Sequence, residues 1–391
     1  MRPLDGLTVV ALEQAVAAPL ATRHLADLGA RVIKIERPGV GDFARAYDTT
    51  VNGMASHFVW LNRSKESLTL NLKEPDAEQI LSRLLSRADV FVQNLAPGAA
   101  ARLSLGSDRL REAYPALVVC NISGYGASGP YRDKKAYDLL IQSETGLLSI
   151  TGTEQEPCKV GISVADIAAG MYAYSGVLTA LLCRQRTGQG TAVDVSLFEA
   201  LGEWMGYPAY YSFGGEAPAR AGASHAAIAP YGPFQSEEGK AVYLGIQNER
   251  EWERFCRVAL QRPELAGDAR FDSNTNRVAH RRELHGVIDE VFGRLGAAEI
   301  LERLGAAQIA SARMNTMREF VEHPQLAARH RWRTVDSPVG PLPALIPPVD
   351  IEGVEPSMGP IPSVGQHTDD ILGELGFDAS AISAWRDRGV I

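Results

Sequence analysis

The chain has 391 residues, of which 45% are hydrophobic and 22% are charged, a composition that is typical of a globular protein and excludes a disordered or fibrous one. This length exceeds what one hydrophobic core normally holds, so we expect one large domain and a smaller companion. The formal charge is -8 and no block of like charge occurs, which argues against a nucleic-acid-binding surface but leaves room for a local anion pocket.

Strands and short helices alternate from the start of the chain to Ser123. Apolar and β-branched runs predict strands at Leu7–Leu12, Arg31–Ile35, Asp89–Asn94 and Ala116–Ser123. Helices are expected at Pro19–Leu28, Asp76–Leu85 and Ser107–Ala113. The alternation predicts an α/β fold with a parallel sheet, which binds ligands at the carboxyl ends of its strands. Those ends are Glu13, Glu36, Asn94 and Ser123.

The chain becomes mainly helical after Pro130. A long helix is expected over Asp166–Arg186, followed by a short strand at Ala192–Val195. The uncharged apolar stretch inside this helix, Ile167–Cys183, is shorter than the roughly 20 residues that span a bilayer. We therefore expect a buried helix and no membrane segment.

A domain boundary is expected near residue 220, because Gly, Ala, Pro and Ser dominate the surrounding residues. The large domain then covers residues 1–220. Residues 221–334, with one predicted strand and several amphipathic helices, form the small α+β domain. Residues 335–391 are expected to be a proline-rich extended linker, a helix and a tail that return to the large domain.

Cysteine usage and the N-terminal residues bear on the cellular compartment. The four cysteines form no CxxC pair and no Cys/His metal spacing, which predicts a reduced, cytoplasmic chain without a structural metal. Asp5 and Glu13 interrupt the apolar residues near the start, so we expect no signal or transit peptide.

Familiar nucleotide-binding and hydrolase motifs do not occur. No GxGxxG follows the first predicted strand, and the sequence has no GxxxxGK[ST], GxSxG or HExxH. The glycines of GYGASGP, residues 124–130, suit a backbone-lined turn near a ligand or a plain structural turn equally well. The candidate chemistry therefore depends on carboxylates and cations.

Two aspartates stand at predicted helix starts. Asp166 immediately precedes an uncharged helix, whose dipole favours an anion there by about 0.3 to 1 kcal/mol. It is a candidate nucleophile, although spacing alone favours a helix-capping role. For Asp138, a structural hydrogen bond at a helix start is the expected role.

Cations recur after predicted strands and in connecting loops. They are Arg37, Lys73, Arg102, Lys134 and Lys135. Each alone is typical of a solvated surface charge, whereas their shared placement favours a phosphate-binding rim. The eight histidines show no metal-ligand spacing. Among them, His225 lies in a loop of small residues, where packing and substrate contact remain open alternatives.

Six blocks of sequence, in order over about the first 200 residues, resemble the class III CoA-transferases, the family of formyl-CoA transferase and carnitine CoA-transferase. One block alone would be weak, whereas six in family order are specific. The blocks are PLDGLTVVALEQAVAAPLATRHLADLGARVIKIERPGVGDFAR, NRSKESLTLNLK, VQNLAPGAAARL, NISGYGASGPYRDKKAYDLLIQSETGLLSITG, VADIAAGMYAYSGVLTALLCRQRTGQG and VDVSLFEA.

The resemblance implies a fold and a reaction. The family's fold is a large Rossmann-like domain built from both termini with a small domain between, in a homodimer of interlocked rings. Asp166 matches the catalytic aspartate, whose carboxylate attacks an acyl-CoA thioester to give a mixed anhydride and then an aspartyl-CoA thioester. Thioester is exchanged for thioester, so the resemblance implies CoA thioesters and carboxylic acids as substrates, and no metal or tightly bound cofactor.

The same comparison with the family implies binding residues. The positions that match its coenzyme-binding residues are Val16, Ala17, Arg37, Leu70, Lys73, Asn94, Leu95, Arg102 and Lys135. Many relatives place a run of glycines over the active site, and this sequence departs from that pattern with RAGASHAA at Arg220–Ala227. We expect this loop to be stiffer, with His225 filling space or touching substrate.

The substrate class follows from a narrower similarity. Segments such as ALEQAVAAP and HAAIAPYGPF are similar to a subgroup that acts on C4 and C5 dicarboxylates, including succinyl-CoA:itaconate and mesaconyl-CoA transferases. We expect succinyl-CoA to donate CoA to itaconate, mesaconate or a related acid. The second carboxylate needs a cation, for which Arg45, Arg220 and His225 are candidates by loop position. Tyr137 is a further candidate for substrate binding.

Two alternatives remain. An α-methylacyl-CoA racemase shares the fold but needs a base where this chain carries Tyr137, and a phenol with a pKa near 10 is a poor base at neutral pH. A non-catalytic acyl-CoA-binding protein is the other alternative, and the presence of Asp166 and Tyr137 argues against it.

Overall fold

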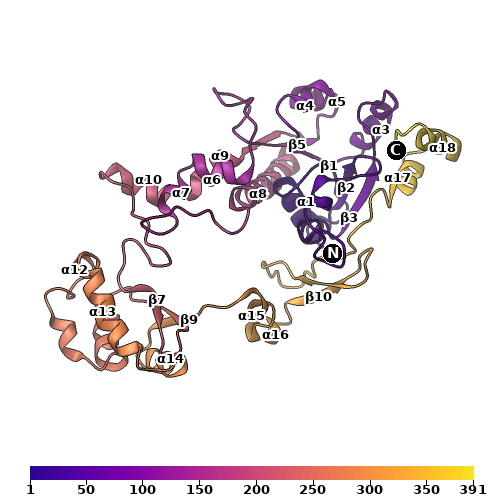
Figure 1. Ribbon diagram of the computed structural model, residues 1–391. Coiled ribbons are helices and arrows are strands. Elements are labelled where there is room, and N and C mark those ends of the chain that lie inside the picture. Colours follow the sequence, from indigo (N-terminus) through magenta and orange to yellow (C-terminus); the bar gives the residue numbers. More distant parts are fainter. The chain divides into compact units, whose positions relative to one another are not determined.

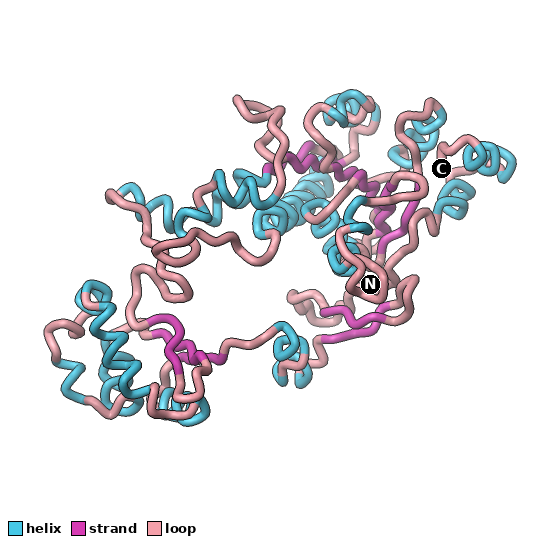
Figure 2. Tube along the Cα trace, viewed as in Figure 1, coloured by secondary structure: helices cyan, strands magenta, loops and turns pink.

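A computed structural model describes residues 1–391 and divides the chain into two compact units. Unit 1 comprises Met1–Thr145, Val160–Met205 and Leu326–Ile391, and unit 2 comprises Gly146–Lys159 and Gly206–Gln325. These boundaries differ from the expected ones at residues 220 and 334. Figures 1 and 2 show the elements of both units.

A six-stranded parallel sheet organises unit 1, in the order β3-β2-β1-β4-β5-β6. The strands are β1 (Thr8–Leu12), β2 (Arg31–Glu36), β3 (Lys65–Thr69), β4 (Val90–Gln93), β5 (Val118–Ser123) and β6 (Ala192–Ser196). The expected α/β class and parallel sheet are therefore confirmed. The order reverses between β1 and β4, and such a switch point is where open parallel sheets bind ligands.

Figure 1 shows the helices of unit 1. They are α1 (Ala17–Asp27), the 3-10 helix η1 (Phe43–Ala46), α2 (Ser56–Leu61), α3 (Asp76–Leu85), α4 (Ala99–Arg102), α5 (Ser107–Ala113), α6 (Asp138–Glu144), α8 (Val164–Thr187), α9 (Leu197–Trp204), α17 (Thr368–Glu374) and α18 (Ala379–Asp387). The bounds of α3 and α5 are those predicted from apolar spacing.

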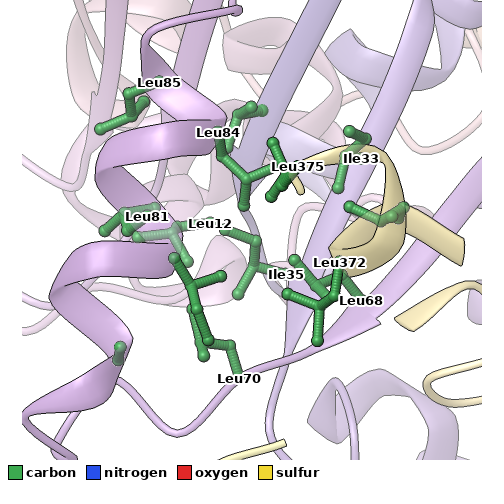
Figure 3. Close-up of a cluster of buried hydrophobic side chains, with 14 of the residues drawn as sticks. Leu12, Ile33, Ile35, Leu68, Leu70, Leu81, Leu84, Leu85, Leu372 and Leu375 are labelled. Atoms are coloured by element: carbon green, nitrogen blue, oxygen red, sulfur yellow. The ribbon is translucent and has the colours of Figure 1, made fainter. Parts of the chain in front are cut away.

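The C-terminal helices complete the core on one face of the sheet. Figure 3 shows leucines of α3 and of α17 meeting the side chains of β2 and β3. The labelled members are Leu12, Ile33, Ile35, Leu68, Leu70, Leu81, Leu84, Leu85, Leu372 and Leu375. Both ends of the chain thus build one core, as the resemblance implied.

Helix α8 is buried on one face only. Alanines and Gly170 line the buried face, whereas Met171 and Leu182 are exposed. A Cβ on Gly170 would lie 2.7 Å from the carbonyl oxygen of Ala17, so α1 and α8 touch through their backbones. By length and composition α8 is the one helix that could cross a membrane, with 39% of its most apolar window buried. The expected burial is therefore correct for one face of the helix only.

The proline-rich segment after residue 331 contains a hairpin that the sequence did not predict. Strands β10 (Trp332–Val335) and β11 (Leu342–Leu345) pair antiparallel. Val335 and Leu342 are buried with Phe58 of α2. The expected extended linker is wrong here, because proline is tolerated on an edge strand and hides the apolar alternation.

Unit 2 contains a three-stranded antiparallel sheet in the order β7-β8-β9. The strands are β7 (Tyr231–Gln235), β8 (Ala241–Gly245) and β9 (Ala310–Arg313). The helices are α7 (Leu147–Ile150), α10 (Gly206–Phe213), α11 (Glu249–Arg254), the π-helix η2 (Phe255–Ala259), the 3-10 helix η3 (Pro263–Gly267), α12 (Asn274–Ala279), α13 (Arg281–Phe292), α14 (Ala297–Ala306) and α15 (Met317–Val321). Helix α16 (Pro324–Ala328) spans the boundary between the units. Only β8 was expected, because β9 is fully exposed and lacks apolar alternation.

Candidate active site

Asp166 lies in the first turn of α8, where a neighbouring carboxylate caps the helix. The amides of Ala165 and Asp166 donate to Oδ1 of Asp138, at 2.8 and 3.3 Å. Ser163, which occupies the N-cap position, makes no side-chain cap bond. Asp138 thus has the structural role expected of it, although it serves α8 and not its own helix α6.

A second hydrogen bond fixes the orientation of the Asp138 carboxylate. Its Oδ2 accepts from Nε2 of Gln142, at 2.6 Å, and Oε1 of Gln142 accepts from the amide of Val160, at 3.0 Å. The carboxylate is therefore held with Oδ1 directed toward the start of α8.

Burial, together with a smaller contribution from the charge of Asp138, raises the pKa of Asp166 to about 7. A shift of this size corresponds to about 4 kcal/mol, which exceeds the 0.3 to 1 kcal/mol that the dipole of α8 returns to the anion. The sequence predicted a helix-stabilised anion, and burial outweighs that effect. A carboxylate of raised basicity is a stronger nucleophile once it ionises.

One phenol, that of Tyr47, is electrostatically coupled to Asp166, and Tyr47 is in turn coupled to Tyr137. Tyr137 precedes α6 and is 69% exposed. Burial raises the pKa of Tyr47 to about 12, with further contributions from Asp42, Asp166 and Tyr137. The ring of His57 packs edge-on against Tyr47 at 5.5 Å, and its Nδ1 is buried without a partner. Tyr47 and His57 were missed, although Tyr47 follows β2, at whose carboxyl end ligands are expected.

The carboxyl ends of β1 and β4 are tied together by Asn94. Its Oδ1 accepts from the amide of Gln14, at 2.9 Å, and its Nδ2 donates to the carbonyl of Gln14, at 2.8 Å. The next residue, Ala15, has φ 62° and donates its amide to Oδ1 of Asp42, at 3.2 Å. The Asn94 side chain, predicted to bind coenzyme, is therefore occupied by the backbone.

The turn before α1 lies against the helix that carries Asp166. Ala15 and Val16 pack in one apolar cluster with Ile167 of α8. Val16 is buried, and no side chain caps α1. Val16 and Ala17 are both predicted to bind coenzyme. Their side chains are buried, so only their backbone amides are placed to bind it.

A pocket of about 490 Å³ lies beside α3, α4 and α5 of unit 1. Its lining combines the cations Lys73, Arg102 and Arg109 with apolar side chains such as Leu72 and Leu105. Glu74 and Glu78 also line it, and Oε1 of Glu78 lies 3.7 Å from Nη2 of Arg109. Lys73 and Arg102 are thus brought together as predicted from their shared placement. Arg109 was missed, because it lies inside a predicted helix and not in a loop.

The remaining predicted coenzyme residues do not line this pocket. Leu70 is buried in the core of unit 1, and Leu95 packs partly against the same core. Arg37 and Lys135 are exposed. No group of three His, Cys, Asp or Glu side chains is placed to hold a metal ion.

Arg45 is held by the protein itself. Its Nε and Nη2 pair with the carboxylate of Glu36, at 2.9 and 2.7 Å, and its guanidinium lies 3.6 Å from the ring centroid of Phe58. Burial opposes the ionised form of Glu36, but Arg45 and Lys34 together lower its pKa to about 2. Arg45, predicted to bind a substrate carboxylate, therefore carries a charge that Glu36 already balances.

Arg220 belongs to unit 2 and braces a loop there. Its Nε, Nη1 and Nη2 donate to the carbonyls of Thr153, Ser149 and Glu154, at 2.7, 3.2 and 2.8 Å. The structure gives this predicted substrate residue a structural role, because three backbone oxygens fix its guanidinium.

His225, also in unit 2, is packed and partly engaged. Its ring stacks on Tyr231 at 5.4 Å, and its Nδ1 accepts from the amide of Ala227, at 3.1 Å. Asn274 holds the same loop by accepting from the amide of Ala229 and donating to the carbonyl of Ala227. Nε2 of His225 is the ring nitrogen left to meet a ligand.

Comparison with known proteins shows which family the chain resembles along nearly its whole length. The family model "CoA-transferase family III" matches residues 4–368. Succinyl-CoA:glutarate CoA-transferase of Homo sapiens is 32% identical, covering 100% of this chain and 90% of that protein. Succinyl-CoA:mesaconate CoA-transferase of Haloarcula marismortui is also 32% identical, covering 97% and 98%. The crystal structure of a CAIB/BAIF family protein from Brucella suis has a TM-score of 0.84 and 31% identity, covering 96% of this chain and 99% of that one.

The raised pKa of Asp166 predicts that stability falls as the pH rises. Between about pH 4 and pH 7 the unfolded chain releases this proton before the folded chain does, so the free energy of unfolding declines and then stays low above pH 7. Asp166→Asn removes this dependence. Between pH 5 and pH 8, we expect the free energy of unfolding of the wild type to fall by about 2 kcal/mol relative to that of the variant, measured by urea unfolding.

Asp133→Asn is the matched control, since this aspartate is 79% exposed. Its stability should follow the wild type at both pH values. An Asp166→Asn variant that tracks the wild type in the same way would contradict the raised pKa.

Proposed function

This chain belongs to CoA-transferase family III, and from that premise we propose that it moves CoA from succinyl-CoA to a C4 or C5 dicarboxylic acid such as itaconate, mesaconate or glutarate. The two named relatives support this substrate class, because each pairs succinyl-CoA with a C5 dicarboxylate. We further propose a cytoplasmic location, which its four free cysteines support.

In the proposed reaction Asp166 is acylated twice. Its carboxylate attacks the carbonyl carbon of the donor thioester, and the CoA thiolate leaves, which gives a mixed anhydride. The thiolate then attacks the Asp166 carbonyl, releases the donor acid and forms an aspartyl-CoA thioester. The acceptor carboxylate attacks this thioester, and the freed thiolate attacks the acceptor carbonyl of the new anhydride, restoring Asp166.

The observation that carries this mechanism is the partly buried, basic carboxylate of Asp166. Raised basicity favours its attack on a thioester, whose thiol leaving group has a pKa near 8.5. Its partial burial also limits the access of water to the anhydride. The amides of Val16 and Ala17, in the turn that lies against α8, supply hydrogen bonds to the developing oxyanion.

The pocket lined by Lys73, Arg102 and Arg109 takes the phosphate-bearing end of CoA in this proposal. Guanidinium groups match phosphate oxygens bidentately, and the leucine side chains supply an apolar surface for a base. Tyr47, the phenol coupled to Asp166, and Tyr137, which is coupled to Tyr47, donate to substrate carboxylates. Arg45 is not assigned this role, because Glu36 already neutralises it.

We also propose that the chain forms a homodimer. Helix α10 of unit 2 presents aromatic side chains to solvent, with Tyr210 at 77% and Phe213 at 81% exposure. In unit 1, Leu182 and Trp204 are likewise exposed, at 59% and 48%. Exposed apolar groups at this density are typical of surfaces that another chain covers.

Asp166 and Arg102 should affect different steps. Asp166→Asn should lower transfer at least about 1,000-fold while the variant still binds the donor thioester, because no acyl intermediate can form. Arg102→Ala should raise the KM for the donor about 10-fold with little change in kcat. Both follow from steady-state rates, and hydroxylamine added with donor should inactivate the wild type and Arg102→Ala only.

Asp133→Asn is the control and should behave as the wild type. Full transfer by Asp166→Asn, or hydroxylamine inactivation of that variant, would remove Asp166 from the mechanism. An unchanged donor KM in Arg102→Ala would remove CoA from this pocket.

The acceptor class is tested with a panel of acids. Purified protein and succinyl-CoA should form new thioesters with itaconate, mesaconate and glutarate, detected by mass, and not with acetate or butyrate. The reason is that a site built around hydrogen-bond donors for two carboxylates leaves them unpaired with a monocarboxylate. Transfer to monocarboxylates alone would contradict the dicarboxylate assignment.

Sedimentation velocity tests the homodimer. The wild type should sediment at twice its 42.2 kDa mass, and a double variant Tyr210→Lys and Phe213→Lys should shift toward the monomer, because charge disfavours burial. Asp133→Asn should remain dimeric. A wild type that stays monomeric at all concentrations tested would refute the assembly.

A further inference from the structure

Four charged side chains lie fully buried under the turn that precedes α1, and the proposed mechanism uses none of them. Nζ of Lys34 lies 2.8 Å from Oδ2 of Asp42 and 3.3 Å from Oε1 of Glu13. Nζ of Lys65 lies 2.6 Å from the same Glu13 oxygen. Each of the four side chains has an exposed fraction of 0%. We call them the buried charge cluster.

Stability alone does not explain this cluster. Removing four charges from water carries a desolvation penalty that their mutual attraction only roughly repays, and apolar residues of similar volume often stabilise a fold more. What buried ion pairs supply in return is a fixed geometry at the groups to which they are bonded. The role of the cluster therefore depends on which part of the backbone it fixes.

The cluster holds the end of β1. Oδ1 of Asp42 accepts from the amides of Ala15 and Ala44, at 3.2 and 2.9 Å, while Oδ2 is fixed by Lys34. Ala15 has φ 62°, a left-handed conformation that alanine adopts only where its surroundings enforce it. Glu13, two residues before Ala15, is anchored by both lysines.

The turn held in this way adjoins the residue that reacts. Ala15 and Ile167, the residue after Asp166, pack against the same buried cluster of Val16, Leu20 and Leu61. Gly170, one helical turn beyond Asp166 on the same face of α8, approaches the carbonyl of Ala17 so closely that a Cβ would meet it at 2.7 Å. A displacement of the turn therefore shifts its amides relative to the Asp166 carboxylate.

We propose that Asp42, fixed by Lys34, is a positioning residue that keeps Ala15 left-handed and so aligns the amides of Val16 and Ala17 with the acyl group on Asp166. The inference rests on the proposed function, because it takes Asp166 as the acylated residue. It goes beyond that function by assigning a role to groups that never meet substrate.

The test separates kcat from KM. Asp42→Ala should lower kcat about 10-fold or more, with the KM for the donor thioester within about threefold, because binding is retained while the oxyanion donors lose alignment. Adding Ala15→Gly to Asp42→Ala should restore much of the lost kcat, since glycine adopts the left-handed conformation without support. A purely structural role predicts no such rescue.

Asp89→Ala is the matched control. This aspartate accepts from the amide of Thr8, at 2.8 Å, and pairs with Arg184, at 2.9 Å, so it performs the same chemistry at the opposite end of β1. Asp89→Ala should lower the thermal midpoint yet leave kcat within about twofold. Equal losses of kcat in the two aspartate variants would show a general stability effect and overturn the proposal.

Ala15→Val covers the case in which Asp42→Ala does not fold. It leaves every charge in place, while a β-branched side chain disfavours the left-handed conformation, so kcat should fall with little change in KM. An Ala15→Val enzyme with wild-type kcat overturns the positioning role alone. A wild type that transfers no CoA from any donor contradicts the proposed function as well.

Discussion

One carboxylate, that of Asp138, imposes two opposed conditions on α8. It accepts hydrogen bonds from the amides of Ala165 and Asp166, which fixes where the helix begins, and its charge adds to the effect of burial in raising the pKa of Asp166. A neutral cap would give the first effect without the second. The arrangement therefore couples the start of the helix to the proton affinity of Asp166, and a carboxylate that is harder to ionise is the better nucleophile once it does so. The pocket, the phenols and the turn before α1 have chemical meaning only in relation to this group.

Local pattern was sufficient to predict five of the six strands of the parallel sheet and the position of Asp166. Strand β3 was missed, because its sequence KESLT is not an apolar, β-branched run. The bounds of α3 and α5 follow from apolar spacing and from residues that favour helix starts. The same reasoning failed where the pattern is weak. Strand β9 carries no buried side chain, and β11 contains Pro343, so neither has the alternation that marks a strand.

Charged residues were harder to predict than elements, because their roles depend on partners that are distant in sequence. Glu13 and Glu36 were expected to meet ligands at strand ends, yet they form buried ion pairs with Lys65 and Arg45 instead. The guanidinium of Arg220 donates hydrogen bonds to carbonyls that are 66 to 71 residues away in sequence. A sequence pattern gives the position of a charge along the chain but not the partner of opposite charge. A charged side chain at a switch point is therefore equally consistent with ligand binding and with an internal ion pair.

The return of residues 326–391 to unit 1 has a consequence for synthesis. Leu372 and Trp385 close the same core as Phe91, so the outer face of the parallel sheet remains uncovered on the ribosome until these late residues emerge. Unit 2 has a core of its own around Trp252 and Phe292, and all of its residues are translated earlier. A nascent chain can therefore bury the apolar surface of its middle before that of its beginning, which leaves the unfinished sheet as the segment that chaperones must shield.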